Sequence, residues 1–142
     1  MPPKVSVVIP VYNVGKQLEK CLDSVVAQTF PDIEIIVVND GSTDNSPEII
    51  ARYADKDSRI VVIDKSNEGL AYARKSGIEA AQGEYIQHLD GDDFLEPDAI
   101  ELLYNKAIED AADMVVFPFW FDYVDELSLI HISEPTRHAQ IS

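Results

Sequence analysis

Two apolar runs with an amphipathic segment between them limit how this chain can fold more than any other feature of its sequence. The runs cover residues 4–10 and 33–38 and are rich in valine and isoleucine. Continuous apolar runs of this length are typical of strands buried on both faces, as in a parallel sheet. The helix expected between them, 15–28, carries on one face Leu18, Cys21, Leu22, Val25 and Val26. Because parallel strands need a crossover connection, the sequence predicts a βαβ unit.

The same alternation continues along the chain. Further strands are expected at 60–64, 84–89 and 114–123, and helices at 46–54, 69–81 and 97–111. Ser46 and Pro47 are typical of a helix N-cap and first helical residue, and Gly83 is placed to end the following helix. The predicted fold class is α/β, with three α/β/α layers, a mostly parallel sheet and right-handed crossovers. Ligands of such sheets bind at the carboxyl ends of the strands.

The composition argues against several classes of function. The 142 residues carry a formal charge of −15, which disfavours binding to nucleic acid and to anionic membrane surfaces. The single cysteine, Cys21, rules out an internal disulfide, and its place on an apolar helix face predicts a core residue. No apolar run reaches the roughly 20 residues that span a bilayer. We therefore expect a cytoplasmic domain, held at the inner face of a membrane only through sequence that follows it.

The strongest functional signal is a group of three aspartates directly after the fourth expected strand. Asp90, Asp92 and Asp93 lie within four positions, and in an extended segment Asp90 and Asp92 project to the same side. Unpaired, these carboxylates would repel one another, whereas a hard divalent cation such as Mn²⁺ or Mg²⁺ would hold them together. Gly91 would let a diphosphate approach the backbone. The alternative is an acidic turn that precedes the next helix.

Two weaker signals follow the second and third expected strands. Asp40 stands at a strand end, where its carboxylate could accept a hydrogen bond from a nucleobase or a ribose hydroxyl, and Gly41 permits a sharp turn. The same pair is common in ordinary turns. Asn67 and Gly69 precede a helix whose Arg74 could bind a diphosphate or orient the aspartates, or could be solvated.

Taken in order, these segments resemble family 2 glycosyltransferases of the GT-A fold. The resemblance is carried by residues 5–13, 22–25, 28–29, 34–44, 67–69, 73–74, 83–86 and 89–93, and it extends over residues 4–126. It implies a nucleotide-diphospho-sugar donor, most simply a UDP-sugar, and metal-assisted transfer to the hydroxyl of a saccharide or lipid-linked acceptor. It also implies inversion at the anomeric carbon and a role in polysaccharide biosynthesis for the cell envelope.

The resemblance assigns roles to the matched residues. The donor site would hold Pro10, Val11, Tyr12, Asn13, Asp40, Asn67, Gly69, Arg74, Asp90 and Gly91, with the first four around the base and Asp40 in contact with it. Asp92 would be the direct metal ligand, Asp90 would be shared between ribose and metal, and Asp93 would extend the cluster. Asn39 stands where the family often has aspartate. The family's catalytic base and acceptor site lie downstream, so no base is predicted here.

Residues 127–142 are predicted to be a non-native tail. The stretch from Leu127 to Arg137 resembles the translation of a transposon adapter used for sequencing libraries, and the adapter's reading frame continues into Ile141 and Ser142. We expect the natural domain to extend to Asp125 or Glu126 and the tail not to pack against it. The nucleotide-sugar-binding half would then be residues 1–126, with the acceptor site and any membrane helices beyond.

Other α/β classes fit the motifs less well. A receiver-type signalling domain, the main alternative, needs an acidic pair after its first strand and a lysine after its fifth. After the first expected strand this chain has Pro10, Val11 and Tyr12 where the acidic pair would be, and it has no such lysine after the fifth. A dinucleotide-binding domain needs Gly-X-Gly-X-X-Gly after the first strand, where only Gly15 occurs. A P-loop needs Gly-Lys-Ser or Gly-Lys-Thr, and neither is present.

Overall fold

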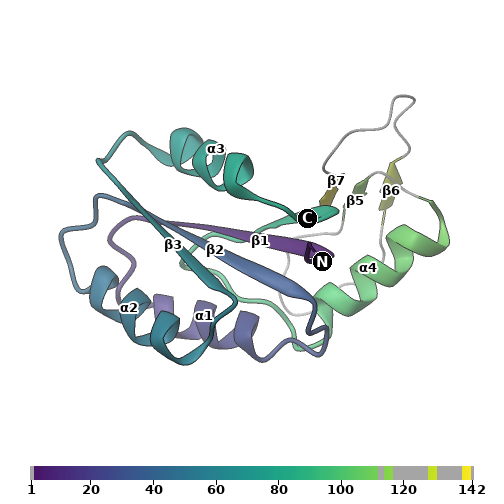
Figure 1. The fold of residues 1–142 in the computed structure, drawn as a ribbon, viewed down its shortest axis with the longest axis horizontal. Coiled ribbons are helices and arrows are strands. Elements are labelled where there is room, and N and C mark those ends of the chain that lie inside the picture. The colour runs from purple at the N-terminus through teal and green to yellow at the C-terminus, as the bar shows by residue number, and fades with distance from the viewer. Residues whose placement is uncertain (1, 112–113, 117–127, 131–138, 142) are drawn as a thin grey trace.

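Figure 1 shows the computed structural model of the chain, which describes residues 2–111, 114–116, 128–130 and 139–141. The helices are α1 (Leu18–Val26), α2 (Ser46–Lys56), α3 (Leu70–Ala80) and α4 (Ala99–Glu109). The strands are β1 (Val5–Val11), β2 (Ile33–Asp40), β3 (Ile60–Lys65), β4 (Tyr85–His88), β5 (Met114–Val116), β6 (Ser128–Ile130) and β7 (Ala139–Ile141). Strands and helices alternate from β1 to β5, as the sequence predicts. No helix in the described part is long and apolar enough to cross a membrane.

The strands form one sheet in the order β3-β2-β1-β4-β7-β5-β6. Every neighbouring pair is parallel except β5 and β6, which are antiparallel. The mostly parallel sheet is therefore confirmed. β1 lies between β2 and β4, whereas the first strand of a receiver domain lies between the second and the third. The strand order thus excludes the receiver alternative.

Side chains of the central strands alternate between two hydrophobic clusters. Val7 and Ile9 belong to a cluster with residues of α1, α2 and α4, whereas Val8 belongs to one with Ala73 of α3. Successive side chains of a strand point to opposite faces, so each face of β1 needs its own cover. Figure 1 accordingly shows α1 and α2 on one face of the sheet and α3 on the other. The predicted three layers are confirmed.

Several element boundaries differ from the predicted ones. β1 is shifted by one residue along the chain, α1 is shorter than expected at both ends, and α4 begins two residues late. Ser46 is the first residue of α2, and Asn45 is the N-cap. The Ser46 hydroxyl accepts a hydrogen bond from the Val14 N–H at 3.2 Å, so it ties the helix to a neighbouring loop. Gly83 lies beyond the end of α3, where its N–H donates to Ser6 Oγ at 2.8 Å.

The segment predicted to be a foreign tail contributes the two short strands β6 and β7. β7 pairs with both β4 and β5, which contradicts our expectation that the tail would not pack. A strand edge presents unpaired N–H and C=O groups, and a short extended segment can satisfy them whatever its origin. Its non-native origin stays a prediction. Of the expected aromatic strand, residues 114–116 form β5, and 117–123 lie outside the described residues.

Replacing Gly77 with alanine is expected to lower the free energy of unfolding by about 1–3 kcal/mol, the usual cost of overpacking. Gly77 lies on the buried side of α3, and a Cβ there would overlap Cγ1 of Val8 on β1. Denaturant unfolding measures the change. Adding Val8→Ala to Gly77→Ala should recover part of the loss, and an unchanged unfolding midpoint for Gly77→Ala would refute this packing argument.

Candidate active site

A pocket of about 420 Å³ opens at the carboxyl ends of β1, β2 and β4, where the sequence places the functional residues. Its lining residues are Pro10, Val11, Tyr12, Val14, Asp40, Asn67, Gly69, Leu70, Ala73, Asp90, Gly91 and Asp92. Eight of the ten predicted donor residues are therefore brought together, along with one further predicted metal ligand. The predicted donor residues Asn13 and Arg74 and the predicted metal ligand Asp93 are missing from the lining.

Three lining residues, Val14, Leu70 and Ala73, were not predicted. Each is apolar and lies near the start of a helix, so the sequence gives it the same pattern as an ordinary core residue. Leu70 is half exposed, which is the only sign that it faces a pocket and not the core. They contribute apolar surface to the lining of the pocket.

Asn13 connects two loops and does not line the pocket. Its side-chain oxygen accepts hydrogen bonds from the backbone N–H groups of Thr43 at 2.8 Å and Asp44 at 3.2 Å. Its φ of 51° is left-handed, a conformation that asparagine tolerates better than most residues. In return, the Ser42 hydroxyl accepts a hydrogen bond from the Asn13 N–H at 3.1 Å. Asn13 thereby fixes the loop after β1 against the loop after β2.

Asp40 is almost completely buried, with 2% of its surface exposed. Its two carboxylate oxygens accept hydrogen bonds from the N–H groups of Glu68 and Gly69, each at 3.0 Å. Asn67 donates from its side-chain amide to the Asp40 backbone carbonyl, also at 3.0 Å. The carboxylate is therefore an anchor for the loop before α3 as well as a wall of the pocket. The sequence predicted that Asp40 lines the ligand site, but it did not predict that Asp40 anchors the loop before α3.

The turn that follows Asp40 needs glycine. Gly41 has a φ of 72°, and a Cβ there would lie 2.7 Å from the backbone nitrogen of Asn67. This agrees with the predicted sharp turn. Beside it, Asn39 uses both ends of its amide: Nδ2 donates to Asp64 at 3.1 Å, and Oδ1 accepts from the Ser42 N–H at 3.1 Å. An aspartate at position 39 could not donate to Asp64, which gives asparagine a local physical reason.

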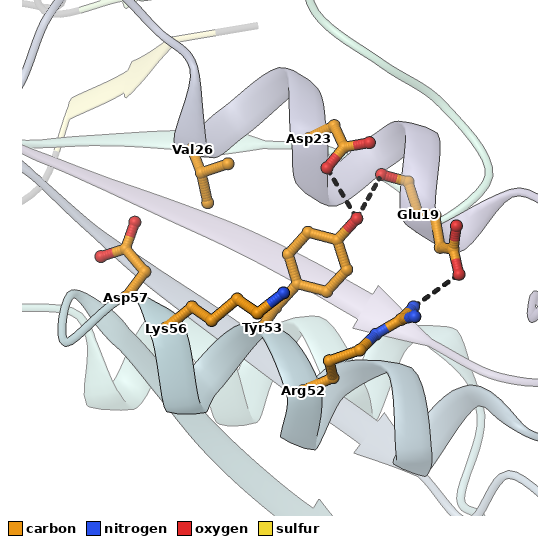
Figure 2. Close-up of a pocket in the computed structure, with 7 residues that line it drawn as sticks. All are labelled: Glu19, Asp23, Val26, Arg52, Tyr53, Lys56 and Asp57. Atoms are coloured by element: carbon orange, nitrogen blue, oxygen red, sulfur yellow. Dashed lines mark hydrogen bonds and ion pairs between the residues drawn. The ribbon is translucent and has the colours of Figure 1, made fainter.

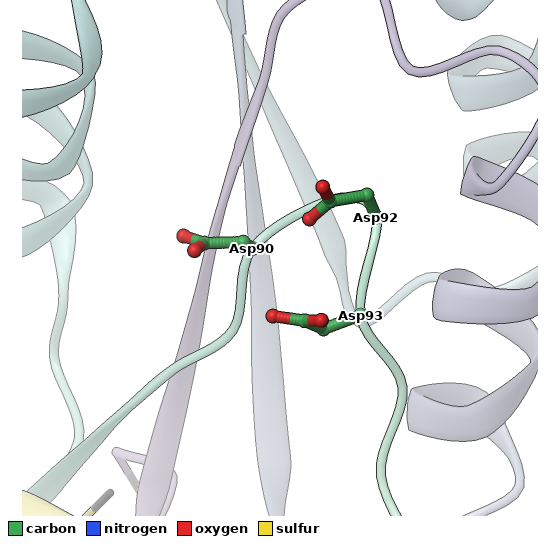
Figure 3. Close-up of side chains that lie close together, drawn as sticks. All are labelled: Asp90, Asp92 and Asp93. Carbon is green, nitrogen blue, oxygen red and sulfur yellow. The ribbon is translucent and has the colours of Figure 1, made fainter. Parts of the chain in front are cut away.

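Asp90, Asp92 and Asp93 converge in the loop after β4, as Figure 3 shows. One carboxylate oxygen from each lies within 4.8 Å of the others. Burial, followed by the charges of Asp92 and Asp90, raises the pKa of Asp93. The cluster is thus electrostatically unfavourable by itself, and three oxygen donors at this spacing fit a hard divalent cation.

Arg74 of α3 pairs with one member of this cluster. Its Nη2 lies 2.9 Å from Oδ1 of Asp90, and both side chains are partly exposed. Of the roles considered for Arg74, the structure has the one in which it orients an aspartate. The pair leaves Asp92 and Asp93 without a positive partner among the described residues.

Gly91 is a buried residue of the acidic loop and lies against the end of β1 and the loop that follows it. Its N–H donates to the Pro10 carbonyl at 3.3 Å, and a Cβ would lie 3.0 Å from Cγ2 of Val14. The pairing of β1 with β4 ends at Val8, so Pro10 lies beyond it and its missing N–H breaks no bond to β4. Close packing of the acidic loop against Pro10 and Val14 therefore explains glycine at position 91.

A second pocket lies between α1 and α2, as Figure 2 shows. It is lined by Glu19, Asp23, Val26, Arg52, Tyr53, Lys56 and Asp57. Its polar groups pair across it: the Tyr53 hydroxyl donates to Asp23 at 2.6 Å, and Arg52 forms an ion pair with Glu19. These contacts join the two helices, and we assign the pocket no further role.

Comparison with known proteins connects this geometry to one family. The sequence profile for glycosyl transferase family 2 matches residues 6–140. Glycosyltransferase GlyA of Streptococcus pneumoniae is 44% identical over 139 residues, which are 97% of this chain and 20% of GlyA. Chondroitin synthase of Pasteurella multocida is 42% identical over 108 residues, 76% of this chain and 11% of the synthase. The chain thus spans only a small part of the length of these relatives.

Solved structures show the same fold. S. aureus TarS 1-349 in complex with UDP-GlcNAc has a TM-score of 0.77 and 27% identity, over 84% of this chain and 35% of that one. The mannosyltransferase PcManGT from Pyrobaculum calidifontis, in complex with GDP-Man and Mn²⁺, has a TM-score of 0.64 and 26% identity, over 72% of this chain and 33% of that one. The α/β prediction therefore agrees with the architecture of these transferases.

Proposed function

The chain belongs to glycosyltransferase family 2, and we propose that it forms the donor-binding part of an enzyme that transfers a sugar from a nucleotide diphosphate to an acceptor hydroxyl. The observation that carries this proposal is the position of the acidic cluster. Asp90 and Asp92 stand at the edge of the same pocket that holds Asp40 and Tyr12. A diphosphate with a base on one side and a sugar on the other fits such a site.

We propose a UDP-sugar as the donor. The base would lie against Pro10, Val11 and Tyr12, with Asp40 behind it, and the ribose would reach Asp90. The UDP and UDP-GlcNAc complexes of TarS support this choice, because that protein shares the fold over most of the described chain. The acceptor would be a saccharide or lipid-linked hydroxyl, in line with the polysaccharide synthases among the relatives.

A divalent cation, Mn²⁺ or Mg²⁺, would be held by Asp92, Asp90 and Asp93. With a net charge of −15, the protein repels a diphosphate unless positive charge is supplied locally. Arg74 is already paired with Asp90, so it does not remove this repulsion alone. When bound, the cation would neutralise the charge that develops on the departing diphosphate. The Mn²⁺ in the PcManGT complex supports this assignment.

Transfer with inversion requires a base that deprotonates the acceptor hydroxyl. The carboxylates that line the described pocket are Asp40, Asp90 and Asp92. Asp40 is buried under backbone donors, and the other two are assigned to the cation. We propose that the base comes from sequence outside residues 1–126, and that Leu127–Ser142 plays no part in donor binding, because every lining residue lies between positions 10 and 92.

The 142-residue chain is expected to bind a UDP-sugar without turning it over. Saturation-transfer NMR with UDP-GlcNAc and Mg²⁺ should show contacts to the uracil and ribose protons, and excess UDP should displace them. The same samples should release no free UDP over time. Removal of Mg²⁺ with EDTA is the control. Absence of displaceable binding would contradict the donor site, and repeated turnover would contradict the missing base.

A further inference from the structure

One face of α1 carries polar side chains where the rest of the buried helix surface is apolar. Cys21 and Ser24 lie three residues apart on α1, and Gln28 follows four residues after Ser24, just beyond the end of the helix. Leu18, Leu22 and Val25 beside them belong to the hydrophobic core. Polar groups in such a position need hydrogen-bond partners, and their partners identify what the face does.

All three side chains contact the segment that carries the acidic cluster. Cys21 Sγ lies 3.6 Å from the Asp90 carbonyl oxygen, and Ser24 Oγ accepts a hydrogen bond from the Leu95 N–H at 3.1 Å. The first two contacts therefore hold the loop on both sides of Asp92.

Gln28 makes the strongest of these connections. Its side chain is almost completely buried, with 7% of the residue exposed. Nε2 donates to the Glu96 carbonyl at 2.6 Å and to the Ser24 carbonyl at 3.0 Å, and Oε1 accepts from the Ile100 N–H at 3.0 Å. A primary amide suits this arrangement, because its nitrogen donates two hydrogen bonds while its oxygen accepts another. Gln28 thus joins α1 to the segment between the acidic loop and α4.

The segment between β4 and α4 has few backbone bonds of its own. From Asp90 to Asp98 it contains no helix or strand, and its only internal backbone bond is from Asp93 N–H to the Asp90 carbonyl. Further contacts come from Pro10, Arg74, α1 and the two residues Gln28 and Thr29 that follow it, with the Thr29 N–H donating to the Pro97 carbonyl at 2.9 Å. Loss of the contacts to α1 would let the loop sample other conformations, and a ligand's affinity falls with the fraction of competent molecules.

We infer that Ser24 and Gln28, with Cys21, are positioning residues that set the geometry of the Asp90–Asp93 loop for its cation. This inference rests on the proposed cation site and adds residues that touch neither the cation nor the donor. Metal sites tolerate little displacement of their ligands, and outer-shell substitutions typically reduce metal affinity by about ten- to a hundred-fold. The face of α1 would therefore control how tightly the cation binds.

The test measures Mn²⁺ binding to the 142-residue chain without nucleotide, by the electron paramagnetic resonance signal of free Mn²⁺. Gln28→Met keeps the size of the side chain and removes all three hydrogen bonds. It should weaken Mn²⁺ affinity about ten-fold. Arg59→Met is the control, because Arg59 donates to the Val26 carbonyl at the end of the same helix but makes no hydrogen bond or ion pair with residues 90–100. It should leave Mn²⁺ affinity within about two-fold, well below an outer-shell effect.

The outcomes separate the two claims. If the unaltered chain binds no Mn²⁺, the cation site and this inference both fail. If it binds Mn²⁺ and Gln28→Met binds equally well, the positioning role is refuted and the cation site stands. Should Gln28→Met not fold, Ser24→Ala removes one hydrogen bond to the loop and should weaken Mn²⁺ about five-fold, as for an ordinary hydrogen bond. Equal Mn²⁺ affinity in Ser24→Ala would then overturn the inference.

Discussion

Replacement of Asp92 by asparagine should abolish divalent-cation binding while the fold stays intact. Asp92 is exposed, and it forms no side-chain hydrogen bond or ion pair with the described residues, so its charge contributes nothing evident to stability. Its carboxylate oxygen is one of three within 4.8 Å. In an enzyme that joins this domain to an acceptor site, the proposed function predicts that metal-dependent transfer falls on the order of a thousand-fold, because a catalytic metal contributes several kcal/mol to the transition state.

Asp98→Asn is the matched control for that change. Both variants replace an aspartate with an asparagine, and Asp98 lies at the N-cap of α4, outside the acidic cluster. Circular dichroism and thermal unfolding should be the same for both variants, whereas Mn²⁺ affinity should be lost only in Asp92→Asn. Near-normal Mn²⁺ affinity or transfer in Asp92→Asn would show that the cluster is an acidic turn and not a metal site.

Asp40→Ala is expected to damage both the fold and donor binding. The substitution leaves the buried N–H groups of Glu68 and Gly69 without an acceptor, and each unsatisfied group costs about 1–3 kcal/mol. The sequence predicted only a hydrogen bond between Asp40 and a base or a ribose hydroxyl, not these two backbone contacts. Because the structure shows an anchor for the pocket wall, we expect the free energy of unfolding to fall by about 3 kcal/mol and UDP affinity to fall with it.

Asp64→Ala provides the comparison for Asp40. Asp64 lies on β3, beside the pocket-forming strand β2, and within the described part of the chain its carboxylate accepts a hydrogen bond from the side-chain amide of Asn39. Denaturant unfolding and UDP calorimetry on the two variants distinguish the roles. Equal, small effects from both would mean that Asp40 is an ordinary turn residue, as the alternative interpretation of its sequence holds.

Much of the fold follows from the pattern of apolar residues along the strands. The apolar runs of β1 and β2 predict strands buried on both faces, and the structure divides their residues between two clusters in just this alternation. Helix ends were less accurate because tertiary contacts override local preference. Ser46 has a good capping side chain but uses it on Val14. The pairing of β7 with β4 depends on which strand edge is free, and no local pattern encodes that.

The sequence predicted those residues of the candidate site that are polar and lie at or just after the end of a strand. Asp40, Asn67, Asp90 and Asp92 meet in one pocket because the ends of parallel strands share an edge of the sheet. Sequence reasoning missed the connections between loops, such as those made by Gln28, because their partners are 68 and 72 residues away. A signal did exist, since a buried amide on an otherwise apolar helix face needs partners.

Calorimetric titration of the 142-residue chain with UDP, with Mn²⁺ and again after EDTA, tests the central claim most directly. The pocket at the ends of β1, β2 and β4 holds the proposed base and ribose contacts, and its acidic edge can accept the diphosphate only with a cation. We therefore predict saturable UDP binding with Mn²⁺ that EDTA abolishes and that Asp92→Asn does not show. No binding of UDP with Mn²⁺, or the same affinity after EDTA, would contradict this account.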